Sequence, residues 1–440
     1  MPGSDIIDIF PMGANVTPTG HLTISNIDIA ELAEERGTPL YVFDEPTIRT
    51  IAQRFNRAFS DRYEDVQVVY ACKAWSNVAI LQILEEEGLG FDVVSGEEIS
   101  TVEAANINLN KTFFHGNNKS RSELVQAITS GVGRIVVDNN YELDLLEEIL
   151  NEKNMTQEVL FRVSPGVDPH THSKTTTGVL DSKFGIPIET GEAEKIIEKA
   201  MRSNRIIPKG LHFHLGSPIF ELEPYKKAIK VAFDFASKMK QTNGFIMEEF
   251  SPGGGFASKY LIADKVPDPE VYADTICDQI KELCKSLDLE LPKLTIEPGR
   301  SIISRAGIAV YRTGVIKEIP EIRTYVSVDG GMGDNIRPAI YDAKYEAALI
   351  TRMNDQETKM VTISGKYCES GDILVKDYNL PEPNPGELLA IPASGAYALA
   401  MASNYNASRK PEAVLLNDGG FRIIRRRETI EDILKFDVVQ

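Results

Sequence analysis

The sequence predicts an α/β protein in which a parallel (β/α)8 barrel of TIM type is joined to a mainly β domain built from both ends of the chain. Short β-like segments alternate with amphipathic helical segments from residue 66 to residue 305, which is typical of a parallel sheet. Eight such segments are present, and a (β/α)8 barrel needs eight in about 250 residues. Beyond residue 305 the chain has further β-like segments but little helix.

The eight predicted barrel strands are rich in β-branched and aromatic residues, the composition of buried strands. They are VQVVYACK (66–73), GFDVVS (90–95), KTFFHG (111–116), RIVVDN (134–139), EVLFRVSP (158–165), GLHFHLGS (210–217), MEEFSPGGG (247–255) and KLTIEPGR (293–300). Amphipathic patterns predict helices between them, as in residues 78–88, where Gly88 is a natural stop, and residues 141–153.

A doubly wound open sheet is the alternative architecture. No GxGxxG turn follows the first strand, which weakens a dinucleotide-binding fold of that kind. The barrel is therefore the preferred prediction, and we place it at residues 45–305.

The second domain is predicted from strand-like runs with turn residues between them. These runs are IAVYRTGVIKEI (308–319), RTYVSVDGG (323–331), MVTISGKYC (360–368) and GELLAIPAS (386–394), together with PLYVFDE (39–45) near the N-terminus. We therefore expect a discontinuous β domain made of residues 1–44 and 306–440.

Composition narrows the class of protein. Hydrophobic residues make up 42% of the 440 residues, enough for a sizeable core, and the formal charge of −18 argues against nucleic-acid or membrane partners. No apolar run of about 18 residues and no signal-peptide pattern is present. The four cysteines form no CxxC pair, so we expect no metal site, no disulfide framework and a reducing, cytoplasmic setting.

Lys73 raises the first functional question because it ends a buried strand. Burying an ammonium group costs several kcal/mol unless the group is paired or neutralised. The side chain either extends out of the strand end into water or is retained for the chemistry of its nitrogen. The strand alone leaves both interpretations open.

The other predicted strand ends are also polar, and barrel active sites lie at the C-terminal ends of the strands. The residues at or near these ends are Asp92, Ser95, His115, Arg162, His214, Ser217, the glycines 253–255, Glu297, Gly299 and Arg300. One polar strand end has little meaning, but so many together predict a site.

This set of residues suggests a cofactor. The three glycines permit a close backbone approach to a phosphate, although they also suit a flexible turn. The Glu297 carboxylate could pair with a protonated ring nitrogen or with a nearby arginine. The His214 ring could stack on an aromatic ring or occupy an ordinary position in the core. Together with a lysine for a Schiff base, these groups fit pyridoxal phosphate.

The motifs of the chain resemble those of the diaminopimelate decarboxylases, fold-type III pyridoxal-phosphate enzymes related to alanine racemase. The resemblance runs from about residue 38 to residue 436. It rests on YACKA (70–74), FDVVSGEE (91–98), HGNNKS (115–120), HTH (170–172), DSKFGI (181–186), HLGS (214–217), GGG (253–255), EPGRSI (297–302), DNIRPAIY (334–341), CESGDIL (368–374) and GAYALAMASNYN (395–406).

The resemblance implies a role for individual residues. Lys73 would form the Schiff base, with Asp92 among the cofactor-binding residues, His214 stacked on the ring and Glu297 paired with its nitrogen. The phosphate would be held by Ser217, Gly255, the Gly299 region and Tyr397, and Gly254 and Arg300 would also belong to the cofactor-binding residues. The substrate would be bound by Arg300, Arg337, Tyr341, Glu369 and Tyr397. Cys368 would be the proton donor, and Cys368 and Glu369 would reach into the site of a partner subunit, which implies a homodimer.

The implied reaction is the decarboxylation of meso-2,6-diaminopimelate to L-lysine and CO2, the last step of lysine biosynthesis. Trp75 and Pro218 depart from the family pattern, where asparagine and glutamine are usual. A decarboxylase of another basic or conjugated amino acid, such as ornithine, carboxynorspermidine or an antibiotic precursor, is the alternative. A racemase or a non-catalytic regulator fits less well, since Lys73 and the CESGD motif are both present.

Overall fold

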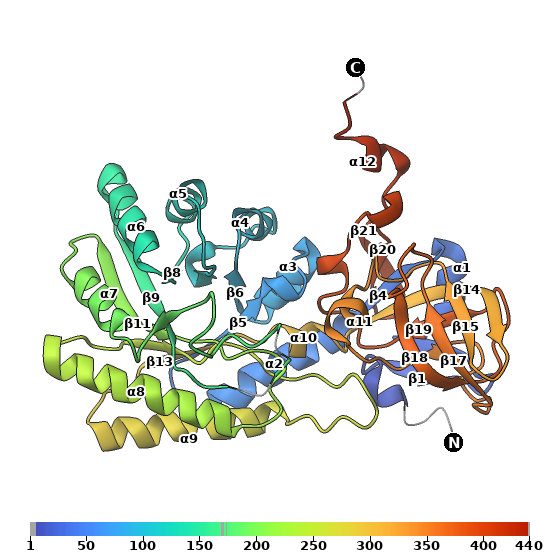
Figure 1. Ribbon diagram of the computed structural model, residues 1–440, viewed down its shortest axis with the longest axis horizontal. Helices are drawn as coiled ribbons and strands as arrows, with labels where there is room; N and C mark the ends of the chain where they lie inside the picture. Colours follow the sequence, from blue (N-terminus) through green and yellow to red (C-terminus); the bar gives the residue numbers. More distant parts are fainter. Residues whose placement is uncertain (1–5, 169–170, 173, 439–440) are drawn as a thin grey trace. The chain divides into compact units, whose positions relative to one another are not determined.

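The computed structural model describes residues 6–168, 171–172 and 174–438, and the chain divides into two compact units (Figure 1). The barrel unit comprises Ile51–Ala257 and Val266–Arg300. The β unit comprises Met1–Thr50, Ser258–Lys265 and Ser301–Gln440. His170, the first residue of the HTH motif, lies outside the described residues.

The barrel unit contains a closed sheet of eight parallel strands, which confirms the predicted fold class. Each predicted strand segment forms one of them, and pairing between β8 and β9 closes the ring, so the open-sheet alternative is wrong. In ring order the strands are β5 (Val66–Ala71), β6 (Gly90–Val93), β7 (Thr112–Phe114), β8 (Arg134–Val137), β9 (Gln157–Ser164), β11 (Ile206–His212), β12 (Glu249–Ser251) and β13 (Lys293–Ile296). The short β10 (Ile186–Pro187) pairs with β9 on one side.

Helices follow the strands and lie on the outside of the ring (Figure 1). Four of them begin at a residue whose side chain caps the helix, namely Asn77, Ser95, Ser120 and Asn139. The helices are α3 (Val78–Glu86), α4 (Gly96–Ala104), α5 (Arg121–Thr129), α6 (Asn140–Lys153), α7 (Glu192–Met201), α8 (Glu223–Asn243) and α9 (Pro269–Leu287). Because all eight strands run parallel, their C-terminal ends lie on one face of the barrel.

The β unit is organised around β4 (Leu40–Asp44). This N-terminal strand pairs antiparallel with β14 (Gly307–Ile319) and parallel with β20 (Glu412–Asn417). The sheet also contains β15 (Arg323–Val328), β16 (Ala348–Leu349), β17 (Lys359–Ser364), β18 (Ile373–Leu380), β19 (Leu388–Ile391) and β21 (Gly420–Arg425). The two ends of the chain therefore share one sheet.

A second, smaller sheet in the β unit consists of β1 (Ala14–Val16), β2 (Leu22–Ile24) and β3 (Ile27–Asp28). Leu22 and Ile24 from this sheet share a buried apolar cluster with Val42, Ile308 and Val414 of the larger sheet. Among the described residues, no helix is both long and apolar enough to span a membrane.

The domain organisation departs from the prediction in three places. Residues 45–50 and 301–305 at the two boundaries, and the internal segment 258–265, were placed within the barrel domain by the sequence analysis and belong to the β unit. The aromatic ring of Tyr260 packs edge-on against Tyr345, with ring centroids 5.4 Å apart, and the Ile262 N–H donates to Glu346 at 2.9 Å. These contacts join residues far apart in sequence, so strand and helix patterns did not reveal them.

Candidate active site

Lys73 lies in a single 3-10 turn (η2, Cys72–Ala74) directly after β5. Its side chain is exposed, whereas Cys72 and Ala74 are buried. The strand end is closely packed, because a Cβ on Gly299 would lie 2.9 Å from the Cβ of Ala71. The EPGR loop therefore packs against the strand that presents Lys73, and the lysine side chain is exposed just beyond the end of that strand.

Glu297 is buried and its carboxylate is hydrogen-bonded on the barrel interior. The Ser251 hydroxyl donates to Oε1 at 2.9 Å, and Nε2 of His212 lies 3.2 Å from Oε2. Burial by itself raises the pKa of Glu297, but the neighbouring imidazoles of His212 and His115 outweigh it and hold the pKa below its usual range. Glu297 is therefore an anion inside the barrel.

Asp92 is the second buried carboxylate of this pocket. Its Oδ1 lies 3.7 Å from Nε2 of His115, which is also 3.7 Å from Glu297 Oε1. Burial raises the pKa of Asp92 to about 8, the Lys73 ammonium opposes the rise, and Glu297 adds to it. Polar atoms of His115, His212 and Glu297 lie within 4.8 Å of one another. A metal ion could fit such a spacing, but the contacts of the two histidines with Glu297 already account for it.

We expect the Asp92 carboxyl to make stability fall with rising pH. An unfolded aspartate has a pKa of about 3.9 and the folded one about 8, so the folded state holds a proton that the unfolded state has released. The contribution is complete below about pH 4 and is lost as pH rises towards 8, at up to ~1.4 kcal/mol per pH unit. Denaturant unfolding at pH 5, 6, 7 and 8 should therefore show the wild type losing stability relative to Asp92→Asn.

The exposed Asp278 supplies a matched control, and Asp278→Asn should follow the wild-type pH dependence. The groups that act on Asp92 are Lys73, Glu297, Glu98, Arg162 and His115, and none of them is changed in either variant. If the free energy of unfolding changed with pH in the same way in the wild type and in Asp92→Asn, Asp92 would have a pKa near that of an ordinary aspartate.

His214 is held against the glycine turn. Its half-buried ring accepts a hydrogen bond at Nδ1 from the Gly254 N–H, at 3.2 Å, which leaves the Nε2 position to carry the proton of the neutral ring. Burial, together with the charge of Lys73, lowers the pKa of His214 well below its usual value. The ring is thus neutral and fixed in orientation, as a stacking residue needs to be.

The glycine run is a close-packed turn. Gly253 has φ +73°, and a Cβ there would lie 2.4 Å from the Phe213 carbonyl oxygen, while a Cβ on Gly254 would lie 2.3 Å from that of Glu297. The Gly253 N–H donates to Ser251 and the Gly254 N–H to His214. Of the three amides, only that of Gly255 has no acceptor among the described residues, so Gly255 is the candidate anion donor.

Ser217 and Arg300 meet beside this turn. Arg300 is buried at the start of α10 (Arg300–Ile303), and its Nε donates to Ser217 Oγ at 3.1 Å. A cation and a hydroxyl near the Gly255 loop are the donor types that bind a phosphate. Pro218, one of the two departures from the family pattern, directly follows Ser217, and the other, Trp75, is buried next to the Lys73 turn.

A second group of predicted residues lies in the β unit, where Arg337 begins the short helix α11 (Arg337–Tyr341). The buried guanidinium donates to the Tyr345 hydroxyl and lies 4.6 Å from the centre of the Tyr260 ring. No carboxylate pairs with it among the described residues. Tyr341 is one helical turn further on the same side of α11. A buried arginine held by two tyrosines is suited to receive a carboxylate.

Cys368 and Glu369 lie on an exposed loop of the β unit, so Cys368 is not a small buried core residue. The Cys368 N–H donates to Asn406 at 3.1 Å, and Glu369 accepts from the Tyr405 hydroxyl at 2.6 Å. Both partners belong to the NYN stretch of the GAYALAMASNYN motif, which ties the two motifs together. Tyr397 of that motif has φ +59°, a left-handed backbone uncommon for tyrosine.

The structure thus gathers the predicted residues into two groups. Lys73, Asp92, His214, Ser217, Gly254, Gly255, Glu297, Gly299 and Arg300 lie in the barrel unit, and Arg337, Tyr341, Cys368, Glu369 and Tyr397 lie in the β unit. The sequence analysis did not single out His212, Ser251, Tyr260 or Tyr345. The HFH spacing was a usable signal for His212, because residues two apart in a strand face the same side.

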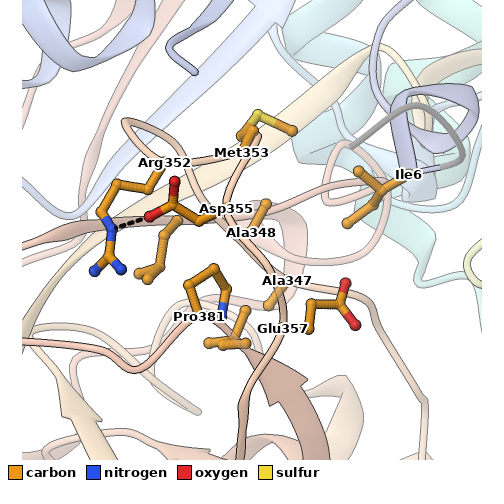
Figure 2. Close-up of a pocket in the computed structure, with 10 residues that line it drawn as sticks. Ile6, Ala347, Ala348, Arg352, Met353, Asp355, Glu357 and Pro381 are labelled. Carbon is orange, nitrogen blue, oxygen red and sulfur yellow. Dashed lines mark hydrogen bonds and ion pairs between the residues drawn. The ribbon is translucent and has the colours of Figure 1, made fainter. Parts of the chain in front are cut away.

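A separate pocket of the β unit contains none of these residues (Figure 2). Its lining is largely apolar, including Ala348 and Met353, and Figure 2 shows its arginine, Arg352, paired with Asp355 at 2.7 Å. Arg352 also pairs with Glu387 at 2.8 Å. Because this charge is already neutralised, the pocket is a poor candidate for binding a charged ligand.

Comparison with known proteins shows the class of enzyme to which the chain belongs. The family model described as the pyridoxal binding domain of the pyridoxal-dependent decarboxylases matches residues 48–304. The diaminopimelate decarboxylase of Bacillus subtilis (strain 168) is 44% identical over 419 residues, which cover 95% of each chain. The chain is therefore an enzyme of the pyridoxal-dependent decarboxylase class, and its cofactor is pyridoxal phosphate.

Solved structures narrow the class to a family. The diaminopimelate decarboxylase of M. jannaschii in complex with L-lysine superposes with a TM-score of 0.92 at 34% identity, covering 100% of this chain and 99% of that one. The Helicobacter pylori diaminopimelate decarboxylase, also in complex with L-lysine, gives 0.86 at 31% identity and covers 93% and 99%. This chain belongs to the diaminopimelate decarboxylase family.

Proposed function

We propose that this chain decarboxylates meso-2,6-diaminopimelate to L-lysine and CO2 with pyridoxal phosphate. The observation that carries the proposal is the barrel site, in which an exposed lysine after β5, a buried Glu297 that accepts two hydrogen bonds and an oriented His214 occur together. Relatives at up to 44% identity carry the name of this activity, and two similar solved structures contain L-lysine.

The residues of the barrel fit the cofactor. Buried polar atoms without a partner in the described chain surround Glu297, namely Asp92 Oδ1, His115 Nε2 and His212 Nδ1, and buried polar atoms are normally satisfied. Beside the glycine turn, hydrogen-bond donors for a phosphate are provided by Arg300, Ser217 and the Gly255 amide. The first group of atoms suits the polar edge of the cofactor, and the second suits its phosphate.

The mechanism assigns one task to each group. When bound, pyridoxal phosphate supplies an aldehyde for linkage to an amine and a ring that takes up the electrons released with CO2. Lys73 Nζ would hold the cofactor through its aldehyde. The Glu297 carboxylate would hold a proton on the ring nitrogen, and the His214 imidazole would stack on the ring.

The residues of the β unit are proposed to bind the far end of the substrate and to complete the reaction. Arg337, with Tyr341 beside it on α11, receives the distal carboxylate, Arg300 assists, and Glu369 accepts the distal ammonium. The Cys368 thiol gives a proton to the substrate Cα after CO2 has left. Its exposed position on a loop is compatible with delivery to a partner subunit's site, and we propose a cytoplasmic homodimer with shared sites.

Substrate choice tests the function. Lysine and ornithine have no distal carboxylate, so they would leave the buried Arg337 guanidinium unpaired, and a site built for a polar group rejects analogues that lack it. We expect meso-diaminopimelate to be decarboxylated with a kcat/KM at least about 100-fold above either. CO2 release from each amino acid under identical conditions measures the ratio.

Variants of Arg337 test the same point from the protein side. Arg337→Ala should lower kcat/KM for diaminopimelate by about two to three orders of magnitude and leave cofactor affinity near the wild-type value. Arg337→Lys keeps the charge but loses the planar fork, so it should recover only part of the activity. The exposed Arg422 supplies the control, since Arg422→Ala should have no effect. Equal turnover of ornithine and diaminopimelate would refute the assignment of substrate.

A further inference from the structure

Two buried carboxylates share the barrel pocket, and only one of them can be charged at low cost. Asp92 and Glu297 each lie 3.7 Å from the same nitrogen of His115. Burial penalises each charge, and two like charges so close oppose one another, which separates their proton affinities. Hydrogen-bond donors decide which carboxylate keeps the charge.

The donors are distributed unequally between the two. Glu297 accepts from the Ser251 hydroxyl on one oxygen and faces Nε2 of His212 on the other, at 2.9 and 3.2 Å. Asp92 Oδ1 has no donor among the described residues. The two donors therefore stabilise charge on Glu297, in agreement with the raised pKa of Asp92 and the lowered pKa of Glu297.

The hydrogen-bond pattern also assigns the proton of the His212 ring. Its Nδ1 is buried and has no partner among the described residues. A proton on Nδ1 would be unpaired and would turn the Nε2 lone pair towards an anion, whereas a proton on Nε2 forms a charge-assisted bond with Glu297. The ring of His115 packs edge-on against that of His212, with centroids 4.8 Å apart, and fixes its plane.

We propose that His212, together with Ser251, is a positioning residue that holds Glu297 ionised and in one orientation, and so controls the protonation of the cofactor's ring nitrogen. His212 is the last residue of β11, and His214 follows it by two residues in the loop beyond the strand. One strand end thereby supplies both the stacking ring and the support for the carboxylate. The inference rests on the proposed contact between Glu297 and the ring.

The test measures the ring nitrogen directly and uses no substrate. Apoenzyme is reconstituted with pyridoxal phosphate labelled with nitrogen-15 in the ring, and the nitrogen chemical shift is followed against pH. His212→Leu removes the donor, and we expect the titration midpoint of the ring nitrogen to fall by about one to two pH units, the size of a lost bond to a charged group. His212→Gln keeps an N–H donor and should remain within about half a unit of the wild type.

A second measurement separates positioning from general damage. Apoenzyme is titrated with pyridoxal phosphate and with its analogue in which carbon replaces the ring nitrogen. His212→Leu should weaken binding of pyridoxal phosphate about tenfold and binding of the analogue much less, because the analogue makes no contact that depends on a charged Glu297. Ser251→Ala, a smaller change, should show the same difference to a lesser degree.

Glu297→Gln is the reference variant and should leave the ring nitrogen unprotonated. A ring-nitrogen midpoint in His212→Leu equal to that of the wild type, with the proton lost in Glu297→Gln, would overturn the role of His212 and leave the proposed function intact. A protonated ring in both variants would remove Glu297 from its proposed place and the inference with it. An equal loss of affinity for pyridoxal phosphate and for its carbon analogue in His212→Leu would mean that His212 has only a structural role. A wrong substrate assignment changes none of these results.

Discussion

Replacing Lys73 with alanine is expected to lower kcat by at least about three orders of magnitude, because the covalent link to the cofactor is lost. Lys73 lies at the end of β5 in a turn that exposes its side chain, so the change should leave the fold intact. The purified variant should also lose the visible absorption band of a lysine–pyridoxal Schiff base. Absorbance and CO2 release on the same sample measure both effects.

Chemical mapping makes this result specific. Borohydride reduction of the wild type, followed by peptide mass analysis, should place the pyridoxyl group on the peptide that contains Lys73. Lys281 is exposed on α9, and Lys281→Ala should retain the band, the adduct and the activity. A pyridoxyl group found on any other lysine would show that Lys73 is not the linkage.

Mixed dimers are expected to recover activity from two inactive variants. Lys73→Ala and Cys368→Ala should each be nearly inactive as homodimers. If Cys368 serves the site of the partner subunit, a dimer with one subunit of each kind contains one complete site with an intact Lys73 and an intact Cys368. Its activity should reach up to about half that of the wild-type dimer. Activity after unfolding and refolding the mixture, or after co-expression with two affinity tags, measures the recovery.

The matched control allows the same exchange of subunits but cannot form a complete site. Lys73→Ala mixed with the double variant Lys73→Ala, Cys368→Ala should stay inactive, because no combination of these subunits restores Lys73. Mixed dimers that are isolated by both tags and remain inactive would mean that each site is built within one chain.

The barrel was predictable because its signals are local. Each of the eight strands is a short β-branched or aromatic run followed by turn residues, and amphipathic patterns, one of them stopped by Gly88, mark helices between them. Parallel strands linked in this way bring their C-terminal ends to one face. The polar residues at those ends therefore indicated a site, and their types indicated its cofactor. The family comparison confirms the cofactor class.

The details of that site could not be read from the sequence, because they depend on contacts between distant residues. Ser251 and His212 reach Glu297 from other strands, and nothing in a strand pattern specifies which side chains meet inside a barrel. The glycine run was open to interpretation as a flexible turn, and it is the approach of Phe213 and Glu297 carbonyls that requires residues without a Cβ.

The sequence by itself thus determined the eight-stranded barrel, the β-rich remainder of the chain and the residue types of a pyridoxal-phosphate site, since periodicity, caps and strand-end chemistry are local properties. Only the tertiary structure decided that β4 joins strands from the far end of the chain, that Tyr260 packs beside Arg337 and Tyr345, and that Glu297 rather than Asp92 receives the donors. These outcomes are set by burial and hydrogen bonding between residues that the chain separates widely, and neither is visible until the chain has folded.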